Sequence, residues 1–310
     1  MTLLHQDPKA ADPLYHKVQE THPQFNPPTV FRDRVEDLYA TCHDLVDKKF
    51  PNQIKDNFAS CYSELYFGAT FRKGLGLRVS HPSDKGPDYY FQDLDCWAEA
   101  VTLSNGEKDN PNSIAPMEYR MVTDYMKVRE QIMLRITSSF TYKAGKLLDY
   151  IKKGIIRDSQ RVIICINGGW LEGLYRFPSY PVGGFPEVVS ALLPVGNMVL
   201  VINRDDMSIT KRTFEFQDSI AKQRHDSKPQ TIRTDYFIDP TYAHISAVVY
   251  SYANVTDSID ESNLGRDFFV IHNPLTNHAL PAGSFKCGIE YEVEVDGDLI
   301  SIQTTDYGRP

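Results

Sequence analysis

Apolar side chains recur every three or four residues in three stretches of the chain, the spacing of an amphipathic helix. The first begins at Phe31 and ends at Val46, and the second runs from Ile54 to Leu65. The third covers residues 129–153 and is the longest, with Gly154 where a helix end is expected. The spacing therefore predicts two helices early in the fold and one long helix in its middle.

Short runs rich in β-branched and aromatic residues, bounded by Gly, Pro or Asn, predict strands. These runs are residues 75–80, 89–91, 96–103, 161–166, 198–202, 243–252, 268–271, 289–295 and 299–302. The runs at 161–166 and 198–202 are apolar without alternation, so we expect both strands to be buried on two faces. Together the elements predict an α/β chain with a mixed central sheet flanked by helices and a β-rich C-terminal elaboration.

Residues 1–30 carry five prolines and few aliphatic side chains, which predicts a Pro-rich N-terminal arm that is extended on the body or partly disordered. We expect residues 31–310 to form a single α/β domain. Its core would span about residues 54–166, and residues 167–310 would be the C-terminal elaboration.

Composition narrows the class of protein. A hydrophobic fraction of 41% excludes a disordered chain, and no apolar run approaches the roughly 18 residues of a membrane span. The start of the chain has no secretory pattern, and the five cysteines are scattered without a C-x-x-C pair. We therefore expect a soluble, cytoplasmic protein with buried free thiols. The net charge of -8 excludes a protein that binds nucleic acid through a positively charged surface as a whole. It permits an enzyme that contacts nucleic acid in one local cleft.

The strongest candidate for chemistry is the hairpin at residues 86–103. If residues 92–95 form its turn, Tyr89 faces Ala98 and Asp88 falls opposite Glu99. Side chains opposed in this way share one face of the sheet about 5 Å apart, and like charges there destabilise it unless a cation lies between them. Mg²⁺ is commonly held by one or two carboxylates with water and substrate phosphate, so the pair predicts a magnesium site, with Mn²⁺ as a substitute.

Two further side chains are candidates for the same site. Glu64 lies at the edge of the apolar stripe of the second helix and would add a third, auxiliary carboxylate. Lys143 lies beside the apolar stripe of the long helix, from which it can bury its stem and direct its ammonium group to the sheet. Arg72, Lys73, Arg135 and Lys146 are expected to add to a local basic surface.

At these residues the sequence resembles the PD-(D/E)xK nuclease superfamily. The match consists of Glu64 in a leading helix, Pro87-Asp88 at a strand start and Trp97-Ala98-Glu99 in the next strand. A long helix and a buried strand follow, and the resemblance covers about residues 54–166. It implies a restriction-endonuclease-like fold and a Mg²⁺-dependent phosphodiesterase. Asp88, Glu99 and Glu64 would be metal ligands, Lys143 the catalytic cation, and nucleic acid, DNA more than RNA, the substrate.

One position departs from the family pattern, which has lysine two residues after the second acidic residue, where this chain has Val101. Lys143 is the candidate to supply that cation from a neighbouring element. The departure favours an alternative, a catalytically inactive nuclease-fold module that binds nucleic acid or a protein partner. A metal-dependent hydrolase of small phosphorylated molecules is a third hypothesis. Asp88 as a turn residue and Glu99 in a structural salt bridge are alternatives for the two main residues, and the oligomeric state is left open, a homodimer included.

Overall fold

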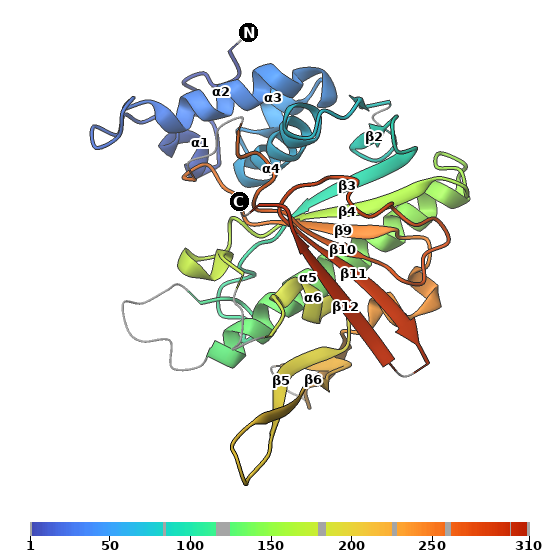
Figure 1. Ribbon diagram of the computed structural model, residues 1–310. Coiled ribbons are helices and arrows are strands. Elements are labelled where there is room, and N and C mark those ends of the chain that lie inside the picture. Colours follow the sequence, from blue (N-terminus) through green and yellow to red (C-terminus); the bar gives the residue numbers. More distant parts are fainter. Residues whose placement is uncertain are drawn as a thin grey trace.

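An eight-stranded mixed sheet runs through the centre of the computed structural model (Figure 1). The structure describes residues 2–82, 85–115, 125–178, 184–224, 228–257, 262–297 and 299–308. In spatial order the strands are β1 (Val79–Ser80), β2 (Tyr89–Phe91), β3 (Cys96–Thr102), β4 (Arg161–Asn167), β9 (Ala247–Ser251), β10 (Phe269–His272), β11 (Ile289–Asp296) and β12 (Leu299–Asp306).

The sheet mixes parallel and antiparallel pairs, with an antiparallel pair at each end. β3, β4 and β9 run parallel to one another, and β10 is parallel to β11. β1–β2, β2–β3, β9–β10 and β11–β12 are antiparallel. Every residue of β9 and all but the first of β4 are buried, as expected for parallel strands covered on both faces.

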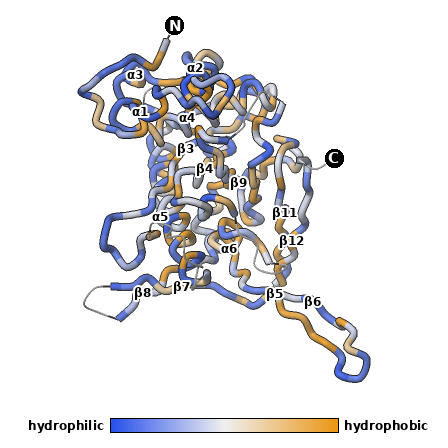
Figure 2. The backbone as a smooth tube through the Cα atoms, turned by 90° about the vertical axis from the view of Figure 1, so that its left-hand side faces the viewer, coloured by the Kyte–Doolittle hydropathy of each residue, from blue (hydrophilic) through white to orange (hydrophobic). Residues whose placement is uncertain are grey.

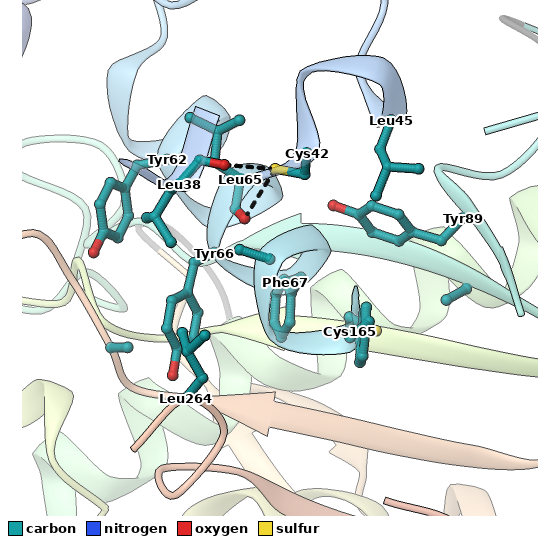
Figure 3. Packing of buried hydrophobic residues seen from close by; sticks show 14 of the residues in the cluster. Leu38, Cys42, Leu45, Tyr62, Leu65, Tyr66, Phe67, Tyr89, Cys165 and Leu264 are labelled. Carbon is teal, nitrogen blue, oxygen red and sulfur yellow. Dashed lines mark hydrogen bonds between the residues drawn. The ribbon is translucent and has the colours of Figure 1, made fainter. Parts of the chain in front are cut away.

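Helices from the first 75 residues cover one face of the sheet. They are α1 (Pro13–Lys17), α2 (Val30–Cys42), η1 (His43–Leu45), α3 (Phe50–Gln53), α4 (Phe58–Ala69) and the π-helical turn η2 (Thr70–Gly74). This layer packs its aromatic side chains on Ala98, Ile163 and Val249, which point to the same face of the sheet. Cys42 ties α2 to α4, because its Sγ donates to the carbonyl oxygens of Leu38 and Leu65 at 3.1 and 3.5 Å (Figure 3).

The opposite face is covered by α5 (Tyr125–Lys152) and α6 (Glu187–Leu192), together with the short turns η3 (Gly173–Arg176), η4 (Tyr236–Ile238) and η5 (Pro240–Tyr242). Trp97, Ile164 and Val248 point to this face, one residue out of step with the residues that face α4. This alternation places helices over both faces of the sheet (Figure 1). The prediction of a mixed α/β sheet flanked by helices is confirmed.

The N-terminal arm differs from the prediction of an extended or partly disordered segment. Residues 13–17 form α1, and Asp12 caps this helix by accepting from the backbone N–H of Leu14. Leu3, Leu4 and Tyr15 are buried in the core beneath α2 and α4. The carboxylate of Glu36 accepts from the backbone N–H groups of Leu3 and Leu4, so this segment is an integral part of the helical layer.

Two hairpins lie outside the main sheet. β5 (Val195–Ile202) pairs with β6 (Ile209–Phe216), and β7 (Ser219–Lys222) pairs with β8 (Gln230–Arg233). The strand predicted at residues 198–202 is present within β5, but the prediction that it is buried is wrong, because residues 200–202 are exposed on a hairpin that leaves the body of the molecule (Figures 1 and 2). β6, β7 and β8 were not predicted, since their charged and polar residues give no strand alternation.

Most remaining elements match the predictions within a few residues. The long helix begins at Tyr125 instead of 129, whereas the strand expected at 75–80 is reduced to Val79–Ser80. All five cysteines are buried and unpaired, as predicted. Among the described residues, no helix combines the length and the apolar character that a membrane span requires.

Candidate functional site

The β2–β3 hairpin has the register that the sequence predicts. Tyr89 pairs with Ala98, Tyr90 with Trp97 and Phe91 with Cys96, so continuing the ladder by one residue sets Asp88 opposite Glu99. Asp88 is held in place because its Oδ2 accepts from the backbone N–H of Ala100 at 2.6 Å. Asp88 directly precedes β2, and the charge of Glu99 acts on its pKa, so the two carboxylates lie near each other where the β2–β3 pairing ends.

Glu99 is the most deeply buried of the predicted site residues, with 0% of its surface exposed. Its Oε1 accepts from two ammonium groups, Lys143 Nζ at 2.6 Å and Lys146 Nζ at 2.7 Å. Its Oε2 is also buried but has no hydrogen-bond partner. A buried carboxylate oxygen without a partner is costly, so this atom marks a place where a cation or a donor is expected.

Both lysines come from α5, which crosses the face of the sheet on which Glu99 lies. They are three residues apart, so they lie on one side of the helix. Lys143 was predicted to direct its ammonium group to the sheet, and its placement confirms this. Lys146 was predicted only as part of a general basic surface. Its spacing from Lys143 was the available sign that it would reach the same carboxylate.

Glu64 comes from α4, in the helical layer on the opposite face of the sheet. Burial, together with the negative charges of Asp88 and Asp47, raises its pKa from 4.5 to about 8. The charges of Glu99 and Lys143 also act on the pKa of Glu64. Glu64 therefore lies close to the group formed by Asp88, Glu99, Lys143 and Lys146, here called the carboxylate–lysine cluster. At neutral pH Glu64 is therefore mostly protonated, and the prediction that it is near the site is consistent with the structure.

The pKa of Asp88 is also raised, again by burial and by a neighbouring negative charge. Burial and the charge of Glu99 raise its pKa from 3.8 to about 6, against the opposing effects of Lys143 and of the hydrogen bond from Ala100. Burial acts to lower the pKa of Lys146, but the hydrogen bonds and charges of Glu99 and Tyr150 together outweigh burial, so the pKa lies above its usual range. At neutral pH Asp88 is therefore mostly ionised, and the charges of Glu99, Lys143 and Lys146 all act on it.

His81 and Asp47 form a hydrogen-bonded pair next to Asp88 that was not predicted. His81 lies between Asp88 and Asp47: its Nδ1 is 2.9 Å from the Asp88 carbonyl oxygen and its Nε2 is 3.1 Å from Asp47 Oδ1. The ring fixes the backbone just before β2. No regular spacing in the sequence joins these three residues, because each comes from a different turn.

The residues fit a divalent cation in part. Asp88 and Glu99 offer two carboxylates, and Glu99 Oε2 is buried and unpartnered, which suits an ion that keeps waters and shares substrate phosphate. In the described part of the chain, however, no group of three or more His, Cys, Asp or Glu side chains is placed to hold one ion. The role of Glu64 as a third ligand therefore stays a prediction.

A half-buried carboxylate, Asp267, provides a contrast. It accepts from the hydroxyl groups of Tyr66 and Ser251 and from the backbone N–H of Ala253. Both of its oxygens are satisfied by neutral donors, and no lysine or arginine contributes to the shift of its pKa. Asp267 therefore has the environment of a structural residue, whereas Glu99 has two cations on one oxygen and none on the other.

Two of the other basic candidates, Arg72 and Arg135, have hydrogen-bond partners elsewhere. Arg72 forms an ion pair with Asp44 and donates to the carbonyl oxygen of Thr41. Arg135 donates to the carbonyl oxygen of Asn112. The two ammonium groups that contact Glu99 both come from α5.

Comparison with known proteins found no matching family model, no similar curated protein and no similar solved structure. The function must therefore be argued from the site itself.

Proposed function

We propose that the chain is a Mg²⁺-dependent phosphodiesterase that hydrolyses nucleic acid, with a restriction-endonuclease-like arrangement of its core. The observation that carries this proposal is the convergence of Asp88, Glu99, Lys143 and Lys146 from the start of β2, from β3 and from α5. Paired carboxylates beside lysines are the groups that phosphodiester hydrolysis requires.

Asp88 and Glu99 would hold the ion, with Glu99 Oε2 as the available buried oxygen. When bound, Mg²⁺ lowers the pKa of a coordinated water and offsets charge on the phosphate oxygens. Lys146 stays protonated through neutral pH and keeps its ammonium group 2.7 Å from Glu99. Its charge and that of Lys143 would orient the scissile phosphate and stabilise the charge that develops on it.

The lysine that the family pattern places at position 101 would be replaced by Lys143. Residues 99 and 101 are two apart in β3, so they share a face of the sheet, and Lys143 reaches Glu99 Oε1 from that side at 2.6 Å. The missing motif lysine is thus compensated by a cation from another element. This placement supports the active enzyme over a module without chemistry.

An inactive binding module remains the second candidate, favoured by one observation. Both lysines contact the same oxygen of Glu99, which would also be the arrangement of a structural ion-pair cluster beside Val101. This candidate predicts binding of nucleic acid or a protein partner that EDTA does not change.

The test is cleavage of labelled single- and double-stranded DNA and RNA in Mg²⁺, in Mn²⁺ and in EDTA. Wild-type protein is expected to cut DNA with either metal and not in EDTA. Asp88→Ala and Glu99→Ala are each expected to abolish cleavage, and Lys143→Ala to reduce it by about 100-fold or more. Asp149→Asn, an exposed change on α5, is the matched control.

Full activity in both carboxylate variants would overturn the assignment of the site. Binding without cleavage, unchanged by EDTA, would favour the inactive module. A panel of nucleotides and small phosphate esters run beside the oligonucleotides separates a small-molecule hydrolase from a nuclease.

A further inference from the structure

Exposed large apolar side chains are concentrated on the hairpin of β5 and β6, residues 195–216, here called the β5–β6 arm. Six of them are 40–72% exposed. They are Leu200, Val201, Ile202, Met207, Ile209 and Phe216. Single exposed apolar residues are ordinary on a protein surface, but a contiguous group of this kind marks an interaction site.

The base of the β5–β6 arm is fixed to the body, whereas its outer part is not. Val195 is buried, and Phe214 packs on Phe185 with ring centroids 4.7 Å apart. Beyond this base the two strands project from the molecule, with the apolar stretch of β5 on the projecting part (Figure 2). The outer part thus has a fixed direction but no core beneath it.

The arm is a two-stranded sheet, so each of its strands has one free edge among the described residues. Ile202 pairs with Ile209, and Leu200 and Val201 pair with Arg212 and Lys211. An isolated pair of strands is at best marginally stable in water. Independent stability needs three or more strands with an apolar face. A partner that supplies further strands would satisfy both the free edges and the apolar side chains.

We propose that the β5–β6 arm is a self-association surface: two copies of the chain pair their arms edge to edge across a two-fold axis, forming a four-stranded sheet. A second copy brings the same strands and the same apolar side chains, as a self-complementary interface requires. Edge-to-edge pairing also places the exposed apolar side chains of the two copies beside one another.

Charge supports a second copy over other occupants. The arm carries three basic residues, Arg204, Lys211 and Arg212, and three acidic residues, Asp205, Asp206 and Glu215, so its net charge is zero. Two arms can therefore meet without the repulsion expected between bodies of net charge -8. A neutral arm offers no attraction to nucleic acid, and the charged tip at residues 203–206 opposes entry into a lipid bilayer.

The test is sedimentation equilibrium of the full chain at about 1–100 µM, the range in which a specific dimer with a micromolar dissociation constant forms. Wild type is expected at twice the mass of the chain. The double variant Leu200→Glu, Ile202→Glu is expected to be monomeric, with dimerisation weakened by about 100-fold or more. Phe25→Glu, an exposed aromatic position between α1 and α2, is the control and is expected to remain dimeric.

A second measurement does not depend on the variant folding. Amide exchange of residues 199–213 in wild type is expected to slow as protein concentration rises. A monomeric wild type, a dimer that persists in the folded double variant, or exchange independent of concentration would each overturn the proposal. Sedimentation of monomeric wild type with anionic lipid vesicles would assign the arm to a membrane and would likewise overturn it.

Discussion

At the scale of single residues, the carboxylate–lysine cluster combines groups that oppose folding. Asp88 faces Glu99 across two strands, and burial raises the pKa of Asp88 to about 6. Glu64 is half-buried nearby, with its pKa raised to about 8. Strongly perturbed carboxylates that share one location are typical of functional sites, because folding alone would favour apolar or neutral side chains there.

Asp88→Asn tests this directly. The amide oxygen can still accept from the Ala100 N–H, while the charge facing Glu99 is removed. We expect the variant to be more stable than wild type by about 1–3 kcal/mol at pH 8 and to lose cleavage by about 100-fold or more. Urea unfolding and a cleavage assay measure the two effects. Asp149→Asn should change neither, and a loss of stability in Asp88→Asn would contradict the account.

Glu64 provides a prediction for pH. Its folded-state pKa of about 8 lies above the ordinary 4.5, so the folded state binds the proton more tightly than the unfolded state does. Wild type should therefore lose stability as the pH rises from 4.5 to 8, by about 1.4 kcal/mol for each pKa unit of the shift.

Glu64→Gln removes this ionisation. Its stability should equal that of wild type near pH 4 and exceed it increasingly up to pH 9, measured by urea unfolding without metal. The exposed change Glu20→Gln is the control and should leave the pH profile unchanged. A constant difference between Glu64→Gln and wild type at all pH values would show that Glu64 does not titrate as described.

At the scale of elements, the sequence predicted the parts of the site that depend on local periodicity. The register of β2 and β3 follows from the length of the turn at residues 92–95, and it set Asp88 opposite Glu99. The position of Lys143 beside the apolar stripe of α5 follows from helical spacing. The His81–Asp47 contact could not be predicted, because it depends on how separate turns meet in space.

The β5 strand was misjudged for a different reason. Its apolar run has the pattern of a buried parallel strand, but burial is decided by what packs on the strand and not by the strand itself. Here the chain leaves the sheet after α6, so residues 200–202 have no layer above them. In the proposed dimer these residues would be covered by the second copy.

A hydrogen-bonded pair between β10 and β11 allows a test of how the C-terminal strands are held. His272 Nε2 lies 2.5 Å from Glu290 Oε1, and both oxygens of Glu290 accept from the Gly283 N–H. Burial opposes ionisation of Glu290, but these donors outweigh it and lower the pKa below 4.5. The resulting stabilisation is present above pH 4.5 and is lost as the pH falls through the lower folded-state pKa.

Glu290→Gln should therefore destabilise the chain by about 1–3 kcal/mol at pH 7, with a difference that shrinks below pH 4. Thermal unfolding followed by circular dichroism at both pH values measures it. The control Glu294→Gln, an exposed change on the same strand, should have little effect at either pH. Equal stability of Glu290→Gln and wild type at pH 7 would contradict the role of the pair.

At the scale of the whole molecule, the sequence predicted an α/β chain with a mixed sheet but not how its layers are completed. Residues 1–30 contain too few apolar side chains to predict a packed segment. Leu3 and Leu4 are nevertheless buried, and Asp12 both caps α1 and accepts from the Phe58 N–H at the start of α4. The N-terminal segment thus contacts and stabilises α4, the helix that carries Glu64.

Leu4→Ala is expected to destabilise the chain by about 2–4 kcal/mol, because a fully buried leucine leaves a cavity when it is truncated. The melting temperature should fall accordingly in a calorimetric scan. Leu299→Ala, the same substitution at an exposed position on β12, is the control. Equal melting temperatures for Leu4→Ala and wild type would restore the prediction of a loosely attached arm.

The central claim is that Asp88 and Glu99 hold a divalent ion together with substrate phosphate. Its most direct test is calorimetric titration of Mn²⁺ into the protein bound to a non-hydrolysable oligonucleotide. The account predicts stoichiometric binding in wild type and in Asp149→Asn, and loss of that binding in Glu99→Gln. Absence of binding in wild type, or equal binding in folded Glu99→Gln, would contradict it.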